Sequence, residues 1–337
     1  IEGAELIGET VSDYTITAGD VKLDIADLEK KYDAVLEPIF KNSLPEMPRP
    51  VSVAYDKGCD LLINKAPGTI AKPKVLIPVF PGTNCEYDMA AAFNRYGGEA
   101  EIFVIRNLSA KNMEDSVNEF AKRIEDSQMI AVPGGFSGGD EPEGSAKFIN
   151  AFFRNPKIKD AVENMLYARD GLMIGICNGF QALIKLGLVP FGKIVPLSSE
   201  SPTLTYNTIG RHQSQLALTK ICTNKSPWLM HCKVGEVYNI PISHGEGRFV
   251  ASDEVIAKLI ENGQIATQYV DLNGEPTMDL AYNPNSSMCA IEGIISPDGR
   301  VLGKMGHTER ISSDTCVNVD GNKEQLLFKG GVDYFRI

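Results

Sequence analysis

The spacing of apolar residues changes along the chain and divides it into three stretches. Between residues 74 and 190, short runs that are almost continuously apolar alternate with segments of helical periodicity. The runs are KVLIPVF, EAEIFVI, MIAVPGG and GLMIGIC. Strands that are apolar on both faces and alternate with helices are typical of a parallel sheet covered on both sides. The pattern therefore predicts an α/β fold with a mostly parallel sheet and helices on both faces.

A second pattern, alternating and rich in turn residues, covers residues 203–250. LTYNTIGRHQSQLALTKI and KVGEVYNIPISHGEGRFV alternate apolar and polar residues over much of their length. Such alternation predicts an antiparallel β segment with one covered face. Two further strand-like runs, MCAIEGIIS and VLGKMGH, come near the end of the chain.

The first 73 residues have a different organisation. YTITAGDVKLDI predicts one or two short strands, and an amphipathic helix is expected to begin near Asp24, with apolar residues at Leu28, Tyr32, Leu36 and Phe40. Polar stretches rich in proline follow, and they are typical of linkers. We expect a small N-terminal piece at 1–45, a linker at 46–73 and one domain at 74–337.

Charge and hydropathy narrow the class of protein. Lys and Arg number 33 against 44 Asp and Glu, so the net charge is −11, and neither a nucleic acid nor an anionic membrane is an expected partner. The most apolar stretch, 171–190, contains Asn178, Gln181 and Lys185, which are costly in a hydrocarbon layer. A membrane span is therefore not expected.

The cysteines and the first residues bear on the compartment. The chain has seven cysteines at wide, irregular spacings and no CxxC pair, which argues against a disulfide framework and against a metal site. The first residues resemble no secretory signal, so a reducing, cytoplasmic location is expected. Ile1 in place of Met fits a piece of a longer protein.

A cysteine ends the last apolar run and is followed directly by a helix-like segment. In GLMIGICNGFQALIKLG, Cys177 stands at this junction between Gly175 and Gly179. A strand, a sharp turn and a helix N-terminus place the thiol at the carboxyl edge of the sheet, where helix amides favour a thiolate and bind an oxyanion. For the G-x-C-x-G motif alone, a buried cysteine packed as a small apolar residue is an equally good interpretation.

A nucleophilic thiol requires a base, and the chain has four histidines. His307 follows a strand-like run, and Glu309 comes two residues later. Because side chains at i and i+2 of an extended segment face the same way, the carboxylate can orient the imidazole. An isolated H-x-E is more often a solvated surface pair, but its place about 130 residues after a cysteine elbow favours a catalytic role.

A second loop at the same edge of the sheet ends the run MIAVPGG. Its Gly134 and Gly135 allow the backbone to come close to a ligand, so this loop can provide a second amide donor for an oxyanion. A simple turn is the competing explanation for either glycine.

These motifs, taken in order, resemble those of a known family. VPGG after a strand, GICNGFQ at a strand-to-helix junction and GHTER after a later strand are similar to the class I glutamine amidotransferases, which use a Cys-His-Glu triad. FPGTNCEYDM, VPGGFSGGDE, GICNGFQALIKLGLVP and HGEGRF resemble the glutaminase domain of the large form of phosphoribosylformylglycinamidine synthase. IGET and DIADLEKKYDAVLEPIF resemble the tail of its ATP-using synthetase region. The resemblance implies a flavodoxin-like core for 74–337 and a synthetase tail for 1–45.

The resemblance also implies a role for each matching residue. Cys177 would be the nucleophile, His307 the general base and acid, and Glu309 the residue that orients the imidazole. Backbone amides of Asn178 and of the Gly135–Phe136 loop would bind the oxyanion. The full set that would hold the oxyanion and the substrate is Gly134, Gly135, Phe136, Asn178, Gln181, Gly245 and Glu246.

Within that set, three residues would contact the polar groups of glutamine. Gln181 lies one helical turn after Cys177 and would hold the polar end of the substrate, with Gly245 and Glu246 near its α-amino and carboxylate groups. One departure is that Thr308 stands where many relatives have proline. Threonine is β-branched and suits extended geometry, so the spacing of the triad is expected to survive.

The implied reaction is hydrolysis of L-glutamine to glutamate and ammonia through a cysteinyl thioester. The ammonia would pass to the synthetase domain of the same enzyme, which uses ATP and Mg²⁺ to make formylglycinamidine ribonucleotide in purine biosynthesis. The chain has no GxxxxGK[ST] loop, so no cofactor is expected in it, and the expected partners are L-glutamine and the synthetase domain. Alone, the chain is expected to turn over slowly.

Other interpretations remain open from the residues themselves. The chain could be a cysteine peptidase or a deglycase-like enzyme on a similar fold, or a non-catalytic regulatory domain. We expect Cys85 to be a packing residue rather than a second catalytic thiol. His244 is expected to be structural, with a substrate contact as the alternative, and the expected scaffold residues are His212, His231 and Trp228.

Overall fold

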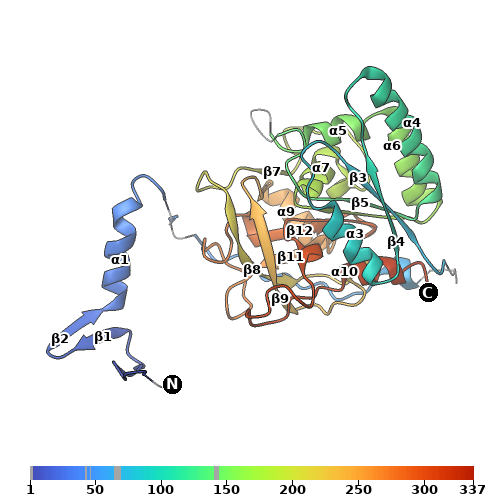
Figure 1. Ribbon diagram of the computed structural model, residues 1–337. Coiled ribbons are helices and arrows are strands. Elements are labelled where there is room, and N and C mark those ends of the chain that lie inside the picture. The colour runs from blue at the N-terminus through green and yellow to red at the C-terminus, as the bar shows by residue number, and fades with distance from the viewer. Residues whose placement is uncertain (1–2, 42–43, 46, 64–69, 140–143) are drawn as a thin grey trace. The chain divides into compact units, whose positions relative to one another are not determined.

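The structure is a computed structural model that describes residues 3–41, 44–45, 47–63, 70–139 and 144–337. The chain divides into two compact units, Ile1–Pro45 and Glu46–Ile337. The second unit, which holds the elements labelled from α3 to α10 in Figure 1, carries Cys177, His307 and Glu309.

The first unit is a hairpin followed by one helix. β1 (Thr15–Ala18) pairs antiparallel with β2 (Val21–Asp24), and α1 (Ile25–Leu36) follows at once. The Asp24 side chain accepts a hydrogen bond from the Asp27 N–H at 3.1 Å and caps the helix, so the helix begins where the sequence predicts. None of the α1 side chains is buried.

The second unit is built on a nine-stranded mixed sheet with the order β4-β3-β5-β6-β13-β12-β11-β8-β9. Neighbouring strands in its first half are parallel. This half comprises β4 (Glu99–Val104), β3 (Lys74–Val79), β5 (Met129–Val132), β6 (Leu172–Ile176) and β13 (Val301–Lys304). β5, β6 and β13 are buried along their whole length, as continuous apolar runs predict for strands covered on both faces.

The second half of the sheet is antiparallel and completes the predicted fold class. It comprises β12 (Ile291–Ile295), β11 (Ile265–Tyr269), β8 (Gln213–Ile221) and β9 (Val237–His244). β9 alternates between buried and half-buried residues, which is the pattern of a strand with one covered face. β8 and β9 come from the expected antiparallel segment and continue the main sheet, whereas β7 (Thr203–Thr205) and β10 (Arg248–Val250) pair in a small sheet of their own.

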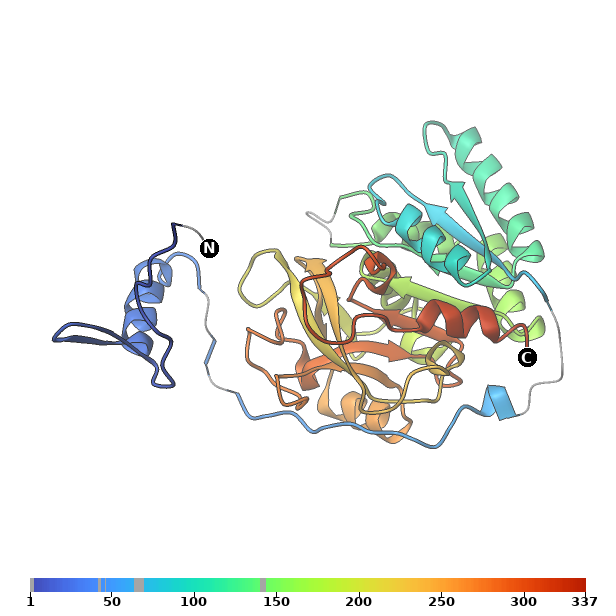
Figure 2. The same ribbon diagram turned by 60° about the horizontal axis from the view of Figure 1, so that its bottom comes forward.

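Helices lie on both sides of the parallel half of the sheet (Figures 1 and 2). On one side are α4 (Ala110–Asp126), α5 (Lys147–Phe153), α6 (Pro156–Glu163) and α7 (Asn178–Leu186). On the other side α3 (Glu86–Arg95) packs against α10 (Leu327–Asp333), where the ring centroids of Phe93 and Phe328 lie 4.9 Å apart. Within the described ranges, no helix is both long enough and apolar enough to cross a membrane.

Residues 47–63 belong to the second unit and are hydrogen-bonded to its sheet. The Tyr55 N–H donates to the Cys222 carbonyl at 2.8 Å, and the Val53 N–H donates to the Gln268 side chain at 2.9 Å. The short helix α2 (Asp60–Ile63) follows. Over its described residues, the stretch expected to be a linker is therefore held against β8 and β11 and is not a free connector.

The parallel strands end at a common edge, where the loops that follow them meet. β3 leads to the loop with Cys85, β5 to Gly134 and Gly135, β6 to Cys177, and β13 to His307. Because the carboxyl ends of parallel strands gather at one edge, residues far apart in the sequence can form one site there.

Candidate active site

Cys177 occupies a strained turn between β6 and α7. Its φ of 52° and ψ of −107° lie outside the regions that L-residues ordinarily adopt, which is the geometry of a nucleophile elbow. The turn requires glycine two residues later, because a Cβ on Gly179 would lie 2.0 Å from the Val132 carbonyl oxygen. The Cys177 N–H is fixed by the Lys304 carbonyl at 2.8 Å.

His307 and Glu309 form a buried pair after β13. The imidazole Nδ1 and the Glu309 Oε1 lie 2.6 Å apart, and both side chains are almost fully enclosed. The His307 N–H donates to the Pro241 carbonyl at 2.8 Å, which ties the loop to β9. The pair is thus buried and not a solvated surface pair. The carboxylate reaches the imidazole through a 3-10 turn at Thr308–Arg310 and not through the extended segment that the sequence predicts, so the extended geometry expected of Thr308 is not found.

The surroundings favour the charged form of His307. Burial lowers the pKa of the imidazole, but the negative charge of Glu309 and the interactions with the Cys177 and Cys85 thiols outweigh burial and raise the pKa well above its usual value. The imidazole is therefore suited to hold a proton taken from a neighbouring thiol.

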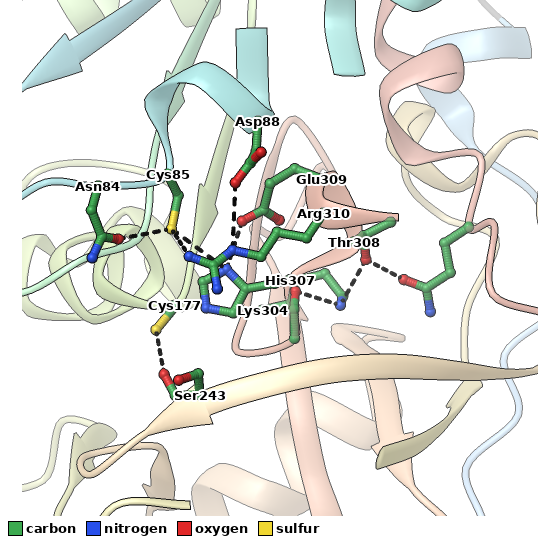
Figure 3. A network of polar contacts seen from close by, with 12 residues as sticks. Asn84, Cys85, Asp88, Cys177, Ser243, Lys304, His307, Thr308, Glu309 and Arg310 are labelled. Atoms are coloured by element: carbon green, nitrogen blue, oxygen red, sulfur yellow. Dashed lines mark hydrogen bonds and ion pairs between the residues drawn. The ribbon is translucent and has the colours of Figure 1, made fainter. Parts of the chain in front are cut away.

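Three side chains, those of His307, Cys85 and Cys177, meet around Gly134. A Cβ at this position would lie 2.7 Å from His307 Cε1, 3.1 Å from Cys85 Sγ and 3.4 Å from Cys177 Cβ. Figure 3 shows Cys177 and Cys85 on either side of the His307 ring. In the structure the Cys177 thiol points to the Ser243 carbonyl, with 3.7 Å between sulfur and oxygen.

Backbone amides that are expected to bind an oxyanion lie in two places. Asn178 is the first residue of α7, so its N–H is among those that a helix leaves without an internal partner. In the loop after β5, Thr83 and Gly135 form an antiparallel bridge flanked by bonds from Asn84 N–H to Gly134 O and from Phe136 N–H to Gly82 O. This pattern turns the Gly135 N–H away from the Thr83 loop.

The expected donor role of Phe136 needs correction. Its N–H donates to the Gly82 carbonyl at 2.8 Å, so in this conformation the amide is engaged within the protein. Gly135 has a φ of 139°, which favours glycine, and a Cβ there would lie 2.5 Å from the Gly82 oxygen. The glycine therefore serves the close packing of two loops.

Gln181 connects α7 to the turn after β9. Its Nε2 donates to the Glu246 carbonyl at 2.6 Å, and its Oε1 accepts from Asn178 Nδ2 at 2.9 Å. Asn178 Oδ1 in turn accepts from the Ser137 N–H at 3.2 Å. The Gln181 side chain thus holds the walls of the site together, and a contact with substrate stays a prediction.

Gly245 and Glu246 lie in that same turn. The Gly245 carbonyl accepts from the Asn207 N–H at 2.8 Å, and Glu246 Oε2 accepts from the Ser145 N–H at 3.2 Å. Glu246 Oε1 is buried and has no hydrogen-bond partner among the described residues. A buried carboxylate oxygen without a partner is suited to an ammonium group.

Cys85 is not simply a packing residue. Its sulfur accepts from Arg310 Nη2 at 3.1 Å, lies 3.1 Å from Asn84 Oδ1 and lies 3.8 Å from His307 Nδ1 (Figure 3). Cys85, His307 and Glu309 have the spacing of metal ligands. The guanidinium at the sulfur and the short bond between Nδ1 and Glu309 are instead the features of a hydrogen-bonded network.

Arg310 is a residue that the sequence analysis did not single out. Burial lowers the pKa of its guanidinium, but the interactions with Cys85, Glu309 and Asp88 raise it above the usual value. Its Nε lies 3.5 Å from Asp88 Oδ2 on α3. The available signal was its position directly after the H-x-E motif, which places it next to the proposed base.

His244 is buried beside the site. Neither ring nitrogen hydrogen-bonds to a described residue, and burial, with smaller effects of His307 and His212, lowers its pKa to about 3. A Cβ on Gly247 would lie 2.6 Å from this ring, so the turn packs closely on it. The imidazole is neutral at ordinary pH.

The three expected scaffold residues have different surroundings. His212 Nε2 lies 2.9 Å from Ser243 Oγ and so belongs to the rim of the site. His231 pairs with Asp333 at 2.8 Å, away from the triad. Trp228 is fully buried, and its Nε1 donates to the Arg300 carbonyl at 3.0 Å. The surroundings of His231 and Trp228 fit the expected scaffold role, whereas His212 also lies at the rim of the site.

The edge of the parallel sheet thus combines a cysteine elbow, a histidine–carboxylate pair and two loops that present amides. This combination is typical of glutamine amidotransferases with a cysteine nucleophile, and sequence comparison finds the same class. Residues 72–335 match the CobB/CobQ-like glutamine amidotransferase domain, and the chain belongs to this family. Its first 71 residues lie outside the match.

Particular relatives are subunits of one enzyme. The chain is 34% identical over 262 residues to phosphoribosylformylglycinamidine synthase subunit PurQ of Chlorobium chlorochromatii, an overlap of 75% of this chain and 93% of that protein. It is 33% identical over 249 residues to the same subunit of Aquifex aeolicus, an overlap of 74% and 95%. Among solved structures, a chain in the structure of PurLQS from Thermotoga maritima is similar with a TM-score of 0.54 and 26% identity, covering 78% of this chain and 99% of that one.

Proposed function

We infer that this chain hydrolyses L-glutamine to glutamate and ammonia, and that the ammonia is used to make formylglycinamidine ribonucleotide in purine biosynthesis. The family and the PurQ relatives support this function. The observation that carries the proposed site is the buried His307–Glu309 pair, which lies beside Cys177 on its strained elbow.

Cys177 is proposed to act as the nucleophile. His307 takes the thiol proton at the nitrogen that faces away from Glu309, and the thiolate attacks the side-chain carbonyl carbon of glutamine. The carbonyl oxygen becomes an oxyanion, for which the N–H groups of Asn178 and Gly135 are the proposed donors. Glu309 stabilises the imidazolium and keeps the ring in the orientation that the reaction needs.

The second half of the reaction returns the enzyme to its first state. The proton on His307 passes to the departing nitrogen, ammonia leaves, and a glutamyl thioester remains on Cys177. His307, now neutral, accepts a proton from water, and the hydroxide attacks the thioester. Collapse of that intermediate releases glutamate and the thiolate, which recovers its proton from the imidazolium.

The turn after β9 is proposed to bind the amino-acid end of glutamine. Glu246 Oε1, buried and without a partner among the described residues, suits the α-ammonium group. Gln181 positions this turn through the Glu246 carbonyl, and Gly245 leaves open space where a side chain would otherwise stand. Substrate binding and the triad are thus connected through α7.

Residues 1–45 are proposed to be the tail of the synthetase region of a large-form enzyme. This unit lies outside the family match, and its motifs resemble that region. α1 and the loop after it carry exposed apolar side chains that suit a partner surface, namely Tyr32, Val35, Ile39 and Phe40. The synthetase component is the proposed partner, in agreement with relatives that are named as synthase subunits.

ATP and Mg²⁺ are proposed to act in the synthetase region and not in this chain. The chain has no GxxxxGK[ST] loop, and the polar groups at the sheet edge suit an amino acid rather than a triphosphate. The chemistry that ATP supplies is activation of an amide oxygen of the acceptor. This chain contributes the ammonia.

The test is release of glutamate from glutamine by the wild-type chain and by the Cys177→Ala variant. We expect turnover by the wild type, slow without the synthetase component and faster with it, and none above background by the variant. Cys85→Ala is the matched control, because it removes a thiol from the same site without removing the elbow. Turnover that survives in Cys177→Ala would exclude the proposed nucleophile, and a peptidase or a non-catalytic domain would release no glutamate from free glutamine.

A further inference from the structure

An ion pair with almost no solvent contact lies beneath the histidine loop. Lys304 at the end of β13 and Glu292 in β12 are 1% and 0% exposed, and Lys304 Nζ lies 3.2 Å from Glu292 Oε1. The other residues of the two strands are buried apolar residues and glycines. A charged residue within such runs requires an explanation other than packing.

The pair is hydrogen-bonded to the residues on both sides of His307. Glu292 Oε1 accepts from the Gly306 N–H at 2.5 Å, and Lys304 Nζ donates to the Gly306 carbonyl at 3.0 Å. Lys304 Nζ also donates to Thr308 Oγ1 at 3.1 Å (Figure 3). The residue before His307 is thus bonded to both charges, and the residue after it is bonded to Lys304.

Further hydrogen bonds extend from the ion pair and Thr308 to other buried side chains, so that the polar groups of this network have partners. Thr308 Oγ1 donates to Gln325 Oε1 at 2.8 Å, and Gln325 Nε2 donates to Thr219 Oγ1 at 3.2 Å. Thr267 Oγ1 donates to the second oxygen of Glu292. A buried network whose members are satisfied favours one arrangement and is rigid.

Stability does not explain a buried ion pair. Removing two charges from water costs several kcal/mol per ion, and well-packed apolar residues of the same volume are often as stable or more stable. Such a pair can instead select one conformation of the groups to which it is bonded. Here those groups are the peptide and side chain that flank the proposed catalytic base.

We propose that Lys304 and Glu292 are positioning residues that set the place of the His307 imidazole relative to Cys177. Lys304 also connects the two catalytic elements, because its carbonyl accepts from the Cys177 N–H at 2.8 Å while its ammonium holds the loop of His307. One residue therefore fixes the backbone of the nucleophile and that of the base. The proposal rests on the proposed function of His307.

The test compares two ways of loosening the loop with a matched control. The double variant Lys304→Met, Glu292→Gln removes both charges, nearly keeps the volume, and leaves an amide oxygen at position 292 that can accept from the Gly306 N–H. Thr308→Val keeps the ion pair and removes the contact between Lys304 and the residue after His307, together with the bond from that residue to Gln325. Thr219→Val is the control, because it removes a buried hydroxyl that belongs to the same network but is bonded to Gln325 and not to the loop of His307.

The measured quantities are kcat and KM for glutamate release, the binding of glutamine in a Cys177→Ala background, and the melting temperature. We expect kcat to fall about 10- to 100-fold in the double variant and less in Thr308→Val, with glutamine binding unchanged, because a displacement of about 1 Å at a catalytic group has effects of this size. Thr219→Val should keep the wild-type kcat.

The other possible results would refute either the positioning role of the ion pair or the proposed function on which it rests. A folded double variant with a kcat within about twofold of wild type would overturn it, and so would an equal loss in Thr219→Val. If the double variant does not fold, the kcat of Thr308→Val tests the proposal, because this variant keeps the ion pair; an unchanged kcat would then overturn it. A wild-type chain that releases no glutamate would refute the proposed function first.

Discussion

Replacement of Gly134 by alanine should slow catalysis while leaving the fold intact. The φ of Gly134 does not lie in the left-handed region, so its backbone accepts an alanine without strain. The added Cβ would lie 2.7 Å from His307 Cε1, whereas carbon atoms in contact are ordinarily about 3.5–4.0 Å apart. The imidazole must therefore move by about 1 Å, or the loop after β5 must move instead.

The size of the effect follows from this displacement. The new methyl group cannot move far from the imidazole, because its other sides are close to Cys85 Sγ at 3.1 Å and Cys177 Cβ at 3.4 Å. A displacement of about 1 Å at a catalytic group costs about 100-fold in rate, which is about 2.7 kcal/mol in the activation free energy. We expect kcat for glutamate release to fall by about this factor.

The control is Gly98→Ala, which introduces a methyl group into a tight position at the opposite edge of the sheet. Its Cβ would lie 3.2 Å from Val332 Cγ2, at the amino end of β4 and far along the strand from the loops of the site. It should lower the melting temperature and keep kcat. A Gly134→Ala enzyme with a wild-type kcat would refute the geometry on which the proposed site depends, whereas an unfolded one would show that the loop cannot absorb the methyl group.

Three further predictions concern protons and thiols at the site. Glu309→Gln should lower the pKa of His307, which is raised above the usual value in the wild type despite burial. The wild type should then be more stable than the variant below about pH 6.5, and this difference should disappear as pH rises through the folded pKa of His307. Urea unfolding from about pH 6 to about pH 10 would measure the difference. His244 has a folded pKa of about 3. Its contribution to the free energy of unfolding is therefore present above about pH 6.5 and is lost as pH falls, by about 2 kcal/mol at about pH 5. His244→Gln should flatten this dependence of the free energy of unfolding on acid pH. A glutamine-mimicking diazo-ketone should modify Cys177 and not Cys85 in peptide mass spectra, and Cys85→Ala should keep kcat within about threefold; modification of Cys85 instead would contradict the assignment of the nucleophile.

Much of the order of elements can be predicted from this sequence. Apolar runs such as those of β5 and β6 predict strands covered on both faces, and the structure has them in the parallel half of the sheet. α9 (Asp253–Glu261), β11 and α10 are not evident from the sequence, since short segments of this kind have no distinctive motif. The path of residues 47–63 across the second unit depends on partners such as Cys222, which no local pattern specifies.

The candidate site could be predicted in part. Cys177, His307 and Glu309 have local signals, namely an elbow and an i, i+2 pair after a strand. Lys304 and Glu292 also had a signal, a charge within an apolar strand, but the meaning of that signal depends on what the charge contacts. The engagement of the Phe136 amide by Gly82 had none, because a hydrogen bond between two loops leaves no trace in either sequence.

The sequence by itself determined which residues are the candidates for the chemistry and which strands bring them to an edge, because reactive side chains and hydrophobic periodicity are properties of neighbouring residues. Only the tertiary structure decided the distances between Cys177, His307 and Gly134, the partner of the Cys85 thiol, and the bonds of a buried ion pair to the histidine loop. Most of these depend on the packing of segments far apart in the chain, and packing at that range is fixed by the shapes of all the side chains between them.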